Sequence, residues 1–218
     1  CGQSRGVALE GGGVLGADGY AYAYDMLGEG AKTHADAQRY WQSYHDAIVS
    51  IGARCVHDDI AQNPGISIKL SALHPRYEVA QTATVLNELT PKALELAQLA
   101  AKFNMGLNID AEEAERLELS LQIVQQLLAN DELADWHGLG VVVQGYNPRA
   151  SEVLEHLYAL AKQYDRHIMV RLVKGAYWDA EIKRAQVLGL SEFPVHTRKA
   201  FTDVAYIANA KRLLGMND

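Results

Sequence analysis

The sequence predicts an α/β protein, and within that class an incomplete (β/α)8 TIM-like barrel with about five of the eight βα units. Apolar strand patterns without clear alternation are followed by amphipathic helix patterns five times along the chain, which is typical of a parallel sheet covered by crossover helices. In a barrel the carboxyl ends of the strands converge on one mouth. Polar or charged residues stand at matching points of the five strands: Asp25, Lys69, Asp110, Gln144 and Arg171.

The first strand and helix are expected close to the start of the regular pattern. Segment 20–29 is predicted as a strand. A helix then begins at Thr33, because Asp36 lies three residues later as in a capping box, and it ends at Gly52. Further strands are expected from 65, 106, 138 and 167, and further helices over about 86–103, 117–128, 151–160, 179–188 and 202–214.

The domain organisation is expected to be simple. Residues 1–19 are Gly-rich and aperiodic, which predicts a flexible N-terminal arm, and residues 20–218 form the partial barrel. Gly11, Gly13 and Gly16 have GxGxxG spacing, but no strand precedes them and no helix follows directly, so we do not interpret them as a dinucleotide site.

Composition excludes several classes of protein. The 20 Lys and Arg residues against 27 Asp and Glu give a net charge of -7, which argues against a nucleic-acid partner. Cys1 and Cys55 form no CxxC pair, which favours a reducing, cytoplasmic setting. No apolar run reaches the roughly 20 residues that span a bilayer. The histidines show no HExxH spacing, and GxSxG and P-loop motifs are missing, so we expect no metal, hydrolase nucleophile or phosphate loop.

Charged residues at the strand ends indicate a ligand site. Lys69 and Asp110 could form a structural ion pair, and Asp110 could cap the following helix. With Arg171 and Lys174 included, three cations would face one carboxylate, which suits an anionic ligand. Tyr177 and Trp178 follow directly. They could simply pack at the corner, but aromatic faces beside a cation also suit flavin.

Longer segments resemble a known family. They are "YDMLGEGAKT", "GISIKLSALHPRYE", "NIDAEEAERLELSL", "GLGVVVQGY", "VRLVKGAYWDAEIKRAQ" and "HTRKAFTDVAY". Together they are similar to the proline dehydrogenase domain of bacterial bifunctional proline utilisation A. The resemblance implies a distorted barrel, noncovalent FAD, and oxidation of L-proline to 1-pyrroline-5-carboxylate by hydride transfer to flavin N5, the first step of proline catabolism to glutamate. Electrons would pass to membrane quinone, which implies a cytoplasmic protein that could make peripheral contact with the inner membrane.

The resemblance also implies roles for individual residues. Arg171, Lys69 and Asp110 are the expected catalytic residues. The expected substrate-binding residues are Lys69, Asp110, Tyr177 and Glu29. The expected FAD-binding residues are Gln144, Arg171, Val173, Lys174, Gly175, Ala176, Trp178, Thr197, Arg198 and Lys199.

The chain also departs from the family pattern. Gly145 and His196 stand where Ala and Tyr are usual, and the later strands with a Thr-His-Asn segment and paired substrate-clamping arginines are not in this sequence. We therefore expect a C-terminally truncated domain, with an aldehyde dehydrogenase domain downstream in the full-length protein and a homo-oligomer as an open question. Two alternatives remain: a noncatalytic fragment of that barrel, or a barrel that binds a phosphorylated anion at Lys69, Arg171 and Lys174.

Overall fold

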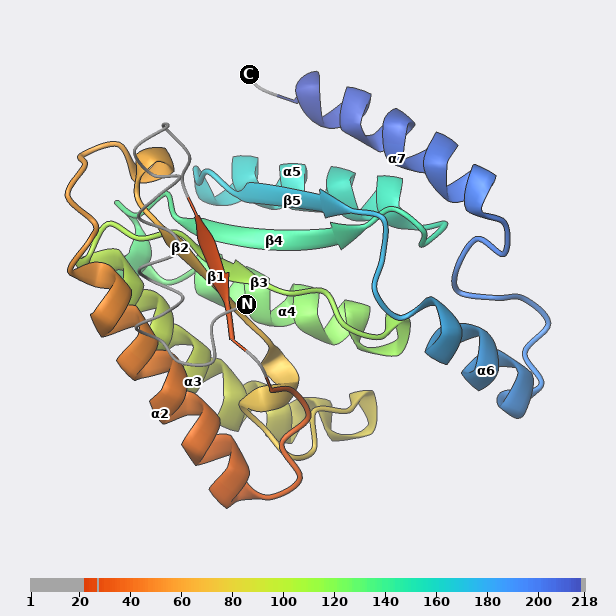
Figure 1. Cartoon of the computed structure of the whole chain (residues 1–218), viewed down its shortest axis with the longest axis horizontal. Helices are drawn as coiled ribbons and strands as arrows, with labels where there is room; N and C mark the ends of the chain where they lie inside the picture. The colour runs from red at the N-terminus through yellow and green to blue at the C-terminus, as the bar shows by residue number, and fades with distance from the viewer. Residues whose placement is uncertain (1–21, 27, 217–218) are drawn as a thin grey trace.

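The computed structural model of the protein describes residues 22–26 and 28–216. The predicted arm at 1–19, with its three spaced glycines, lies outside these described residues. Five parallel strands form one curled sheet in the order β1-β2-β3-β4-β5 (Figure 1). The strands are β1 (Ala23–Asp25), β2 (Gly65–Ile68), β3 (Leu107–Ile109), β4 (Leu139–Gln144) and β5 (Met169–Val173). The predicted α/β half-barrel is therefore confirmed.

Six α-helices accompany the strands in the described part of the chain. Helices α2 to α5 lie along the outer side of the sheet, whereas α6 lies beyond its end (Figure 1). The α-helices are α2 (His34–Gly52), α3 (Thr82–Lys102), α4 (Leu117–Leu128), α5 (Ala150–Tyr164), α6 (Trp178–Leu188) and α7 (Lys199–Leu214). Short 3-10 helices are η1 (Ile60–Gln62), η2 (Leu70–Ala72), η3 (Val79–Gln81), η4 (Ala114–Arg116) and η5 (Asp131–Leu133). None of the described helices is long and apolar enough to cross a membrane.

The start of α2 is the predicted capping box. The Thr33 hydroxyl accepts a hydrogen bond from the Asp36 amide at 3.1 Å, and the Asp36 carboxylate accepts one from the Thr33 amide at 2.9 Å. Two amides that the helix leaves without a partner are thereby satisfied. The helix also ends at Gly52 as predicted.

The sheet has two different faces, a point that the sequence interpretation missed. The outward residues of the inner strands are apolar and belong to the hydrophobic core, whereas Ser67 and Asn108, one position away, are buried polar residues outside it. Successive side chains of a strand point to opposite faces, so the polar residues share the concave face. The expectation of strands without alternation holds for β4, where Val141, Val142 and Val143 are all buried, but it is wrong for β2 and β3. The outward core residues are Ile66, Ile68, Leu107, Ile109, Val141 and Val143.

Two strand boundaries also differ from the prediction. β1 covers Ala23–Asp25 among the described residues, so Met26, Gly28 and Glu29 of the predicted strand lie outside it, whereas residues 20, 21 and 27 are not described. Arg171 lies in the middle of β5, paired with Val142, so it does not stand at the strand end as expected. Its length still lets its guanidinium reach the residues that follow the neighbouring strands.

Candidate functional site

Four charged side chains meet at the carboxyl ends of the strands. The Lys69 ammonium lies 2.9 Å from Asp110 Oδ2 and 3.0 Å from Asp25 Oδ1. Arg171 Nη2 lies 2.6 Å from Asp110 Oδ1, and its Nη1 donates to Ser67 Oγ at 3.1 Å. We call Asp25, Lys69, Asp110 and Arg171 the mouth cluster. Residues separated by as many as 146 positions (171 − 25) therefore form one polar site.

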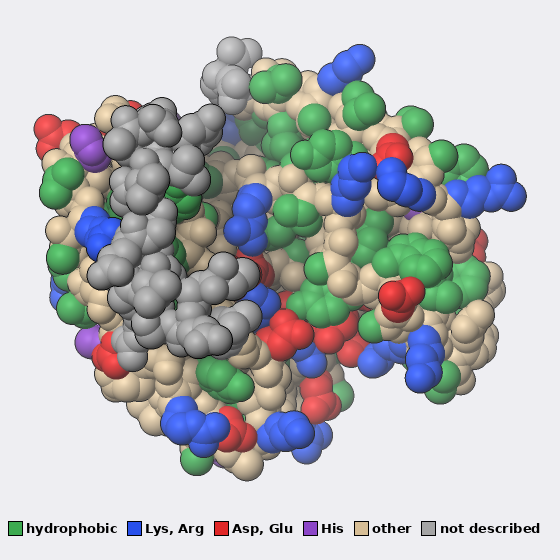
Figure 2. All heavy atoms as spheres, in the orientation of Figure 1, with side chains coloured by type: hydrophobic (Ala, Val, Ile, Leu, Met, Phe, Trp, Pro, Cys, Tyr) green, Lys and Arg blue, Asp and Glu red, His purple; other side chains and the backbone are tan. Residues whose placement is uncertain are grey.

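The charges of the mouth cluster balance, which corrects the expected excess of positive charge. Lys174 makes its ion pair with Asp203 of α7 at 2.5 Å, and Lys199 holds the second oxygen of Asp203 at 2.6 Å. The cluster thus combines two cations with two carboxylates. Acidic and basic side chains gather next to one another near the middle of the face drawn in Figure 2.

The ion pair between Lys69 and Asp110 is largely buried. The exposed fraction of the Lys69 side chain is 15% and that of Asp110 is 8%. Burial opposes the charge on Lys69, but its hydrogen bonds to Asp110 and Asp25 outweigh burial and raise the pKa of the ammonium. Arg171 Nε is buried without a hydrogen-bond partner among the described residues. One N–H of the guanidinium is therefore left unsatisfied by these residues.

Asp110 does not cap a helix, so that alternative is wrong. Both carboxylate oxygens face cations, and the N-cap residue of η4 is Glu113. The structural ion pair with Lys69 that the sequence left open is present. Because removing one partner of the buried Lys69–Asp110 pair would leave the other charged and poorly solvated, these two residues depend on each other.

The end of β5 is fastened to the end of β4 through Gln144. The Gln144 side chain accepts from the Ala176 amide at 2.9 Å and donates to the Glu112 carbonyl at 2.9 Å. Gly175 has a φ of +141°, and a Cβ there would lie 2.3 Å from the Tyr146 ring. Only glycine fits this turn without a shift. The predicted cofactor residues Val173, Gly175 and Ala176 thus lie in one tightly constrained corner, with Val173 paired to Gln144.

The two aromatic residues that follow have structural partners of their own. The Tyr177 hydroxyl donates to Glu29 at 3.2 Å, and its amide donates to the Tyr146 hydroxyl at 3.3 Å. Burial, followed by the negative charge of Glu29, raises the pKa of Tyr177. Trp178 donates from its indole to the His196 carbonyl at 2.9 Å while remaining 41% exposed. Trp178 therefore packs at this corner and also leaves part of its indole ring exposed, so both interpretations of this residue are compatible with the structure.

The other predicted residues lie apart from the mouth cluster. Thr197, Arg198 and Lys199 are exposed at the start of α7, where Arg198 lies over the Phe201 ring at 5.9 Å from its centroid. Asp203 bridges this segment to the end of β5 through its bonds to Lys174 and Lys199. The predicted cofactor residues therefore form one group at the end of β5 and another at the start of α7. The Asp203 carboxylate connects the two groups through Lys174 and Lys199.

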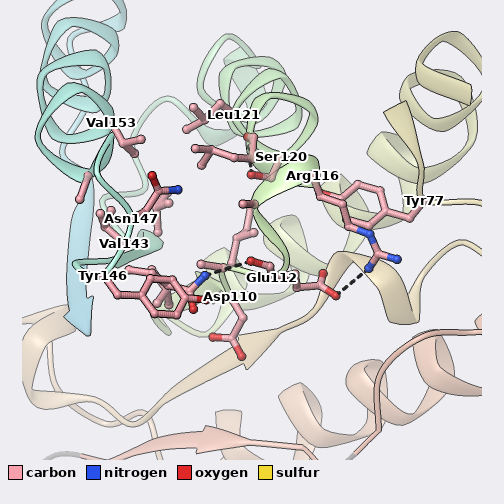
Figure 3. Close-up of a pocket in the computed structure, with 18 residues that line it drawn as sticks. Tyr77, Asp110, Glu112, Arg116, Ser120, Leu121, Val143, Tyr146, Asn147 and Val153 are labelled. Carbon is pink, nitrogen blue, oxygen red and sulfur yellow. Dashed lines mark hydrogen bonds and ion pairs between the residues drawn. The ribbon is translucent and has the colours of Figure 1, made fainter. Parts of the chain in front are cut away.

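A small cavity lies behind the mouth, between β3, β4 and the helices α4 and α5 (Figure 3). Tyr77, Asp110, Glu112 and Tyr146 contribute to its lining. Its volume of about 30 Å³ suits a water or two. It is too small for an amino acid or a flavin, so the candidate ligand site is the open mouth.

Sequence reasoning missed several residues of the site. Ser67 stands two positions before Lys69, so the period of a strand could have placed it on the same face. Tyr44 accepts from the Lys69 amide at 3.1 Å, and burial raises the pKa of Tyr44 to about 12. Tyr44 and Asp203 lie on helices, and no sequence signal connects them with the strand ends.

Comparison with known proteins identifies the family. The family model described as Proline dehydrogenase matches residues 9–218. The chain belongs to the proline dehydrogenase family. It is 52% identical over 215 residues to the bifunctional protein PutA of Salmonella typhimurium and 54% identical over 189 residues to that of Rhizobium meliloti. These alignments cover 99% and 87% of the chain, but only 16% and 15% of the relatives.

Solved structures agree with this assignment. A crystal structure of bifunctional proline utilization A (PutA) superposes with a TM-score of 0.91 at 50% identity, over 99% of this chain and 22% of that one. Proline utilization A (PutA) from Bdellovibrio bacteriovorus, inactivated by N-propargylglycine, gives a TM-score of 0.89 at 26% identity, over 97% of this chain and 23% of that one. The chain therefore spans between 15% and 23% of the length of these longer proteins.

Proposed function

We propose that this chain provides the proline- and FAD-binding strand ends of an enzyme that oxidises L-proline to 1-pyrroline-5-carboxylate in proline catabolism. Membership of the proline dehydrogenase family supports the reaction class. The observation that supports the substrate class is the balanced charge of the mouth cluster.

A balanced mouth suits an amino-acid zwitterion. L-proline carries a carboxylate and a secondary ammonium, so Lys69 and Arg171 can hold the first while Asp25 or Asp110 faces the second. Asp25 is the member that can most easily give up its partner, because 54% of its side chain is exposed whereas Asp110 is nearly buried. A phosphorylated anion fits less well, since both cations are already neutralised by carboxylates.

The residues at the end of β5 fit a flavin. The Arg171 side chain is 38% exposed and carries a positive charge, and Trp178 offers an exposed aromatic face. We expect two parts of the chain to hold FAD. The first consists of Gln144, Arg171, residues 173–176 and Trp178, and the second is the exposed segment 197–199. When bound, FAD supplies the two-electron acceptor for the hydride from the ring carbon next to the proline nitrogen, at N5. Arg171 contributes positive charge beside that acceptor, and Lys69 orients the substrate.

The remaining parts of the proposal concern the longer protein. A membrane quinone is the proposed electron acceptor, which would bring a cytoplasmic protein to the inner membrane surface. An aldehyde dehydrogenase domain further along the chain is consistent with relatives that are named bifunctional and are much longer than this chain.

The test is to titrate the purified chain with FAD and then add L-proline with a dye acceptor. We expect a bound-flavin absorbance spectrum, followed by proline-dependent dye reduction. Flavin binding without turnover would favour the noncatalytic alternative for this chain. Neither binding nor turnover, together with retention of a phosphate ester, would favour the anion-binding alternative and contradict the proposal.

Arg171→Met tests the assigned arginine. Removing a charge-assisted hydrogen-bond donor costs about 1.5–3 kcal/mol, so we expect FAD affinity or the rate of flavin reduction to fall roughly 10- to 100-fold. Arg39→Met is the control, because the Arg39 side chain is 71% exposed and pairs with Asp36 on its own helix. Equal effects of the two substitutions would contradict the role of Arg171.

A further inference from the structure

Helix α6 carries the aromatic corner of the candidate site but is weakly attached to the rest of the molecule. It lies apart from the sheet, near the segment that leads into α4 (Figure 1). Only Glu181 and Ala185 of its eleven residues are buried. Because Tyr177 is its N-cap residue and Trp178 its first residue, whatever fixes α6 also fixes these two side chains.

Glu181 makes a buried contact with another element. Its exposed fraction is 3%, and its Oε1 accepts a hydrogen bond from the Ala114 amide at 2.6 Å. Ala114 is the first residue of η4, and the N-cap residue Glu113 provides no side-chain hydrogen bond there. The first amides of a helical segment lack partners within it. Glu181 therefore acts as the missing cap, supplied by a different helix.

The second contact between these segments is weaker. Arg184, one turn further along α6, pairs with Glu115 of η4 at the surface, where both side chains are about half exposed. An exposed pair of this kind contributes little, whereas a buried hydrogen bond to a charged group is worth more. The link through Glu181 is the main constraint on α6 from this side.

We propose that Glu181 is a positioning residue, which holds Tyr177 and Trp178 against the segment that follows Asp110. The catalytic consequence rests on the proposed function, because it assumes that this corner contacts FAD and proline. Burial and the neighbouring Glu113 and Glu115 raise the pKa of Glu181, although the Ala114 hydrogen bond opposes them. Since a buried carboxylate is costly without its donor, the carboxylate and the Ala114 amide depend on each other.

Amide hydrogen exchange of the chain without any ligand tests the positioning. In Glu181→Ala we expect the amides of Ala114 and of residues 176–178 to exchange about tenfold faster or more, since local opening loses one charged hydrogen bond. Amides of β2 and β3 should not change, which separates local release from general destabilisation. Asp179→Ala is the matched control, because it removes an exposed carboxylate from the same turn.

Two further variants keep the test decisive if Glu181→Ala fails to fold. Glu181→Gln retains an acceptor oxygen, so it should restore exchange rates close to those of the wild type. Ala114→Pro removes the donor at a helical first position that tolerates proline. It should mobilise residues 176–178 as Glu181→Ala does, with no added effect when the two are combined. Unchanged exchange at 176–178 in either Ala114→Pro or Glu181→Ala would overturn the proposal.

The catalytic consequence has its own measurement. If the chain binds FAD and oxidises proline, Glu181→Ala should shift the bound-flavin spectrum and lower kcat more than it raises KM, and Glu181→Gln should restore both. A loss confined to thermal stability would overturn the positioning role. Should the wild-type chain bind no FAD, the proposed function fails while the exchange result still decides whether Glu181 fixes α6.

Discussion

At the scale of single residues, Glu112 is a carboxylate near the site whose ionised form is destabilised by burial. Glu112 has only 4% of its side chain exposed, accepts from the Ser71 amide at 3.0 Å and lies 3.4 Å from Arg116. Burial is the main cause that raises the pKa of Glu112, against the hydrogen bond from Ser71. A neutral side chain with the same acceptor oxygen should satisfy this position at lower cost.

Glu112→Gln should therefore stabilise the protein in a pH-dependent way. Because the pKa of Glu112 is higher in the folded state than its ordinary value of 4.5, the contribution of Glu112 to stability is greatest below pH 4.5. This contribution falls as the pH rises through the folded-state pKa. Glutamine does not titrate, so its advantage should grow from pH 4 to pH 8. Urea denaturation across that range measures it, with the exposed Glu118→Gln as control. The same difference at every pH would contradict the assigned cause.

At the scale of elements, the corner between β5 and α6 depends on one glycine. Gly175→Ala should lower the free energy of unfolding by about 2–5 kcal/mol, because a strained backbone and a clash with Tyr146 add together. Gly189→Ala is the matched control: it also has a positive φ, of +62°, but open space around it, so it should cost only about 1–2 kcal/mol. Denaturation midpoints compare the two. Equal losses would show that the Tyr146 contact is unimportant.

Elements whose signals are local could be predicted from the sequence. The helix from His34 to Gly52 begins at a capping box that four residues encode, and it was predicted correctly. β1 was predicted too long at its carboxyl end, because Met26 continues the strand pattern whereas the pairing with β2 ends at Asp25. The bond between Lys174 and Asp203 could not be predicted, since it depends on how α7 packs after a long connection.

At the scale of the whole molecule, one hydrophobic core joins the sheet to helices α2 to α5. Leu89 of α3 is fully buried in it, whereas Leu188 of α6 is 57% exposed. Leu89→Ala should lower the free energy of unfolding by about 2–5 kcal/mol, and Leu188→Ala by less than about 0.5 kcal/mol. Urea denaturation followed by both circular dichroism and tryptophan fluorescence measures the change. Because the core is shared, both signals should shift together for Leu89→Ala; separate transitions would contradict a single cooperative unit.

The order of the strands has a consequence for synthesis on the ribosome. Each described strand pairs only with its neighbours along the chain, so every new βα unit that leaves the exit tunnel meets a partner strand that has already been made. The mouth cluster would be assembled in the same order. Asp25 can form its ion pair only after Lys69 has been synthesised, and Lys69 can pair with Asp110 only after Asp110 has been synthesised. Arg171 arrives last, 104 residues after the Ser67 that it contacts. The polar site is thus completed at the end of this sequence of events, after the core beneath it has formed.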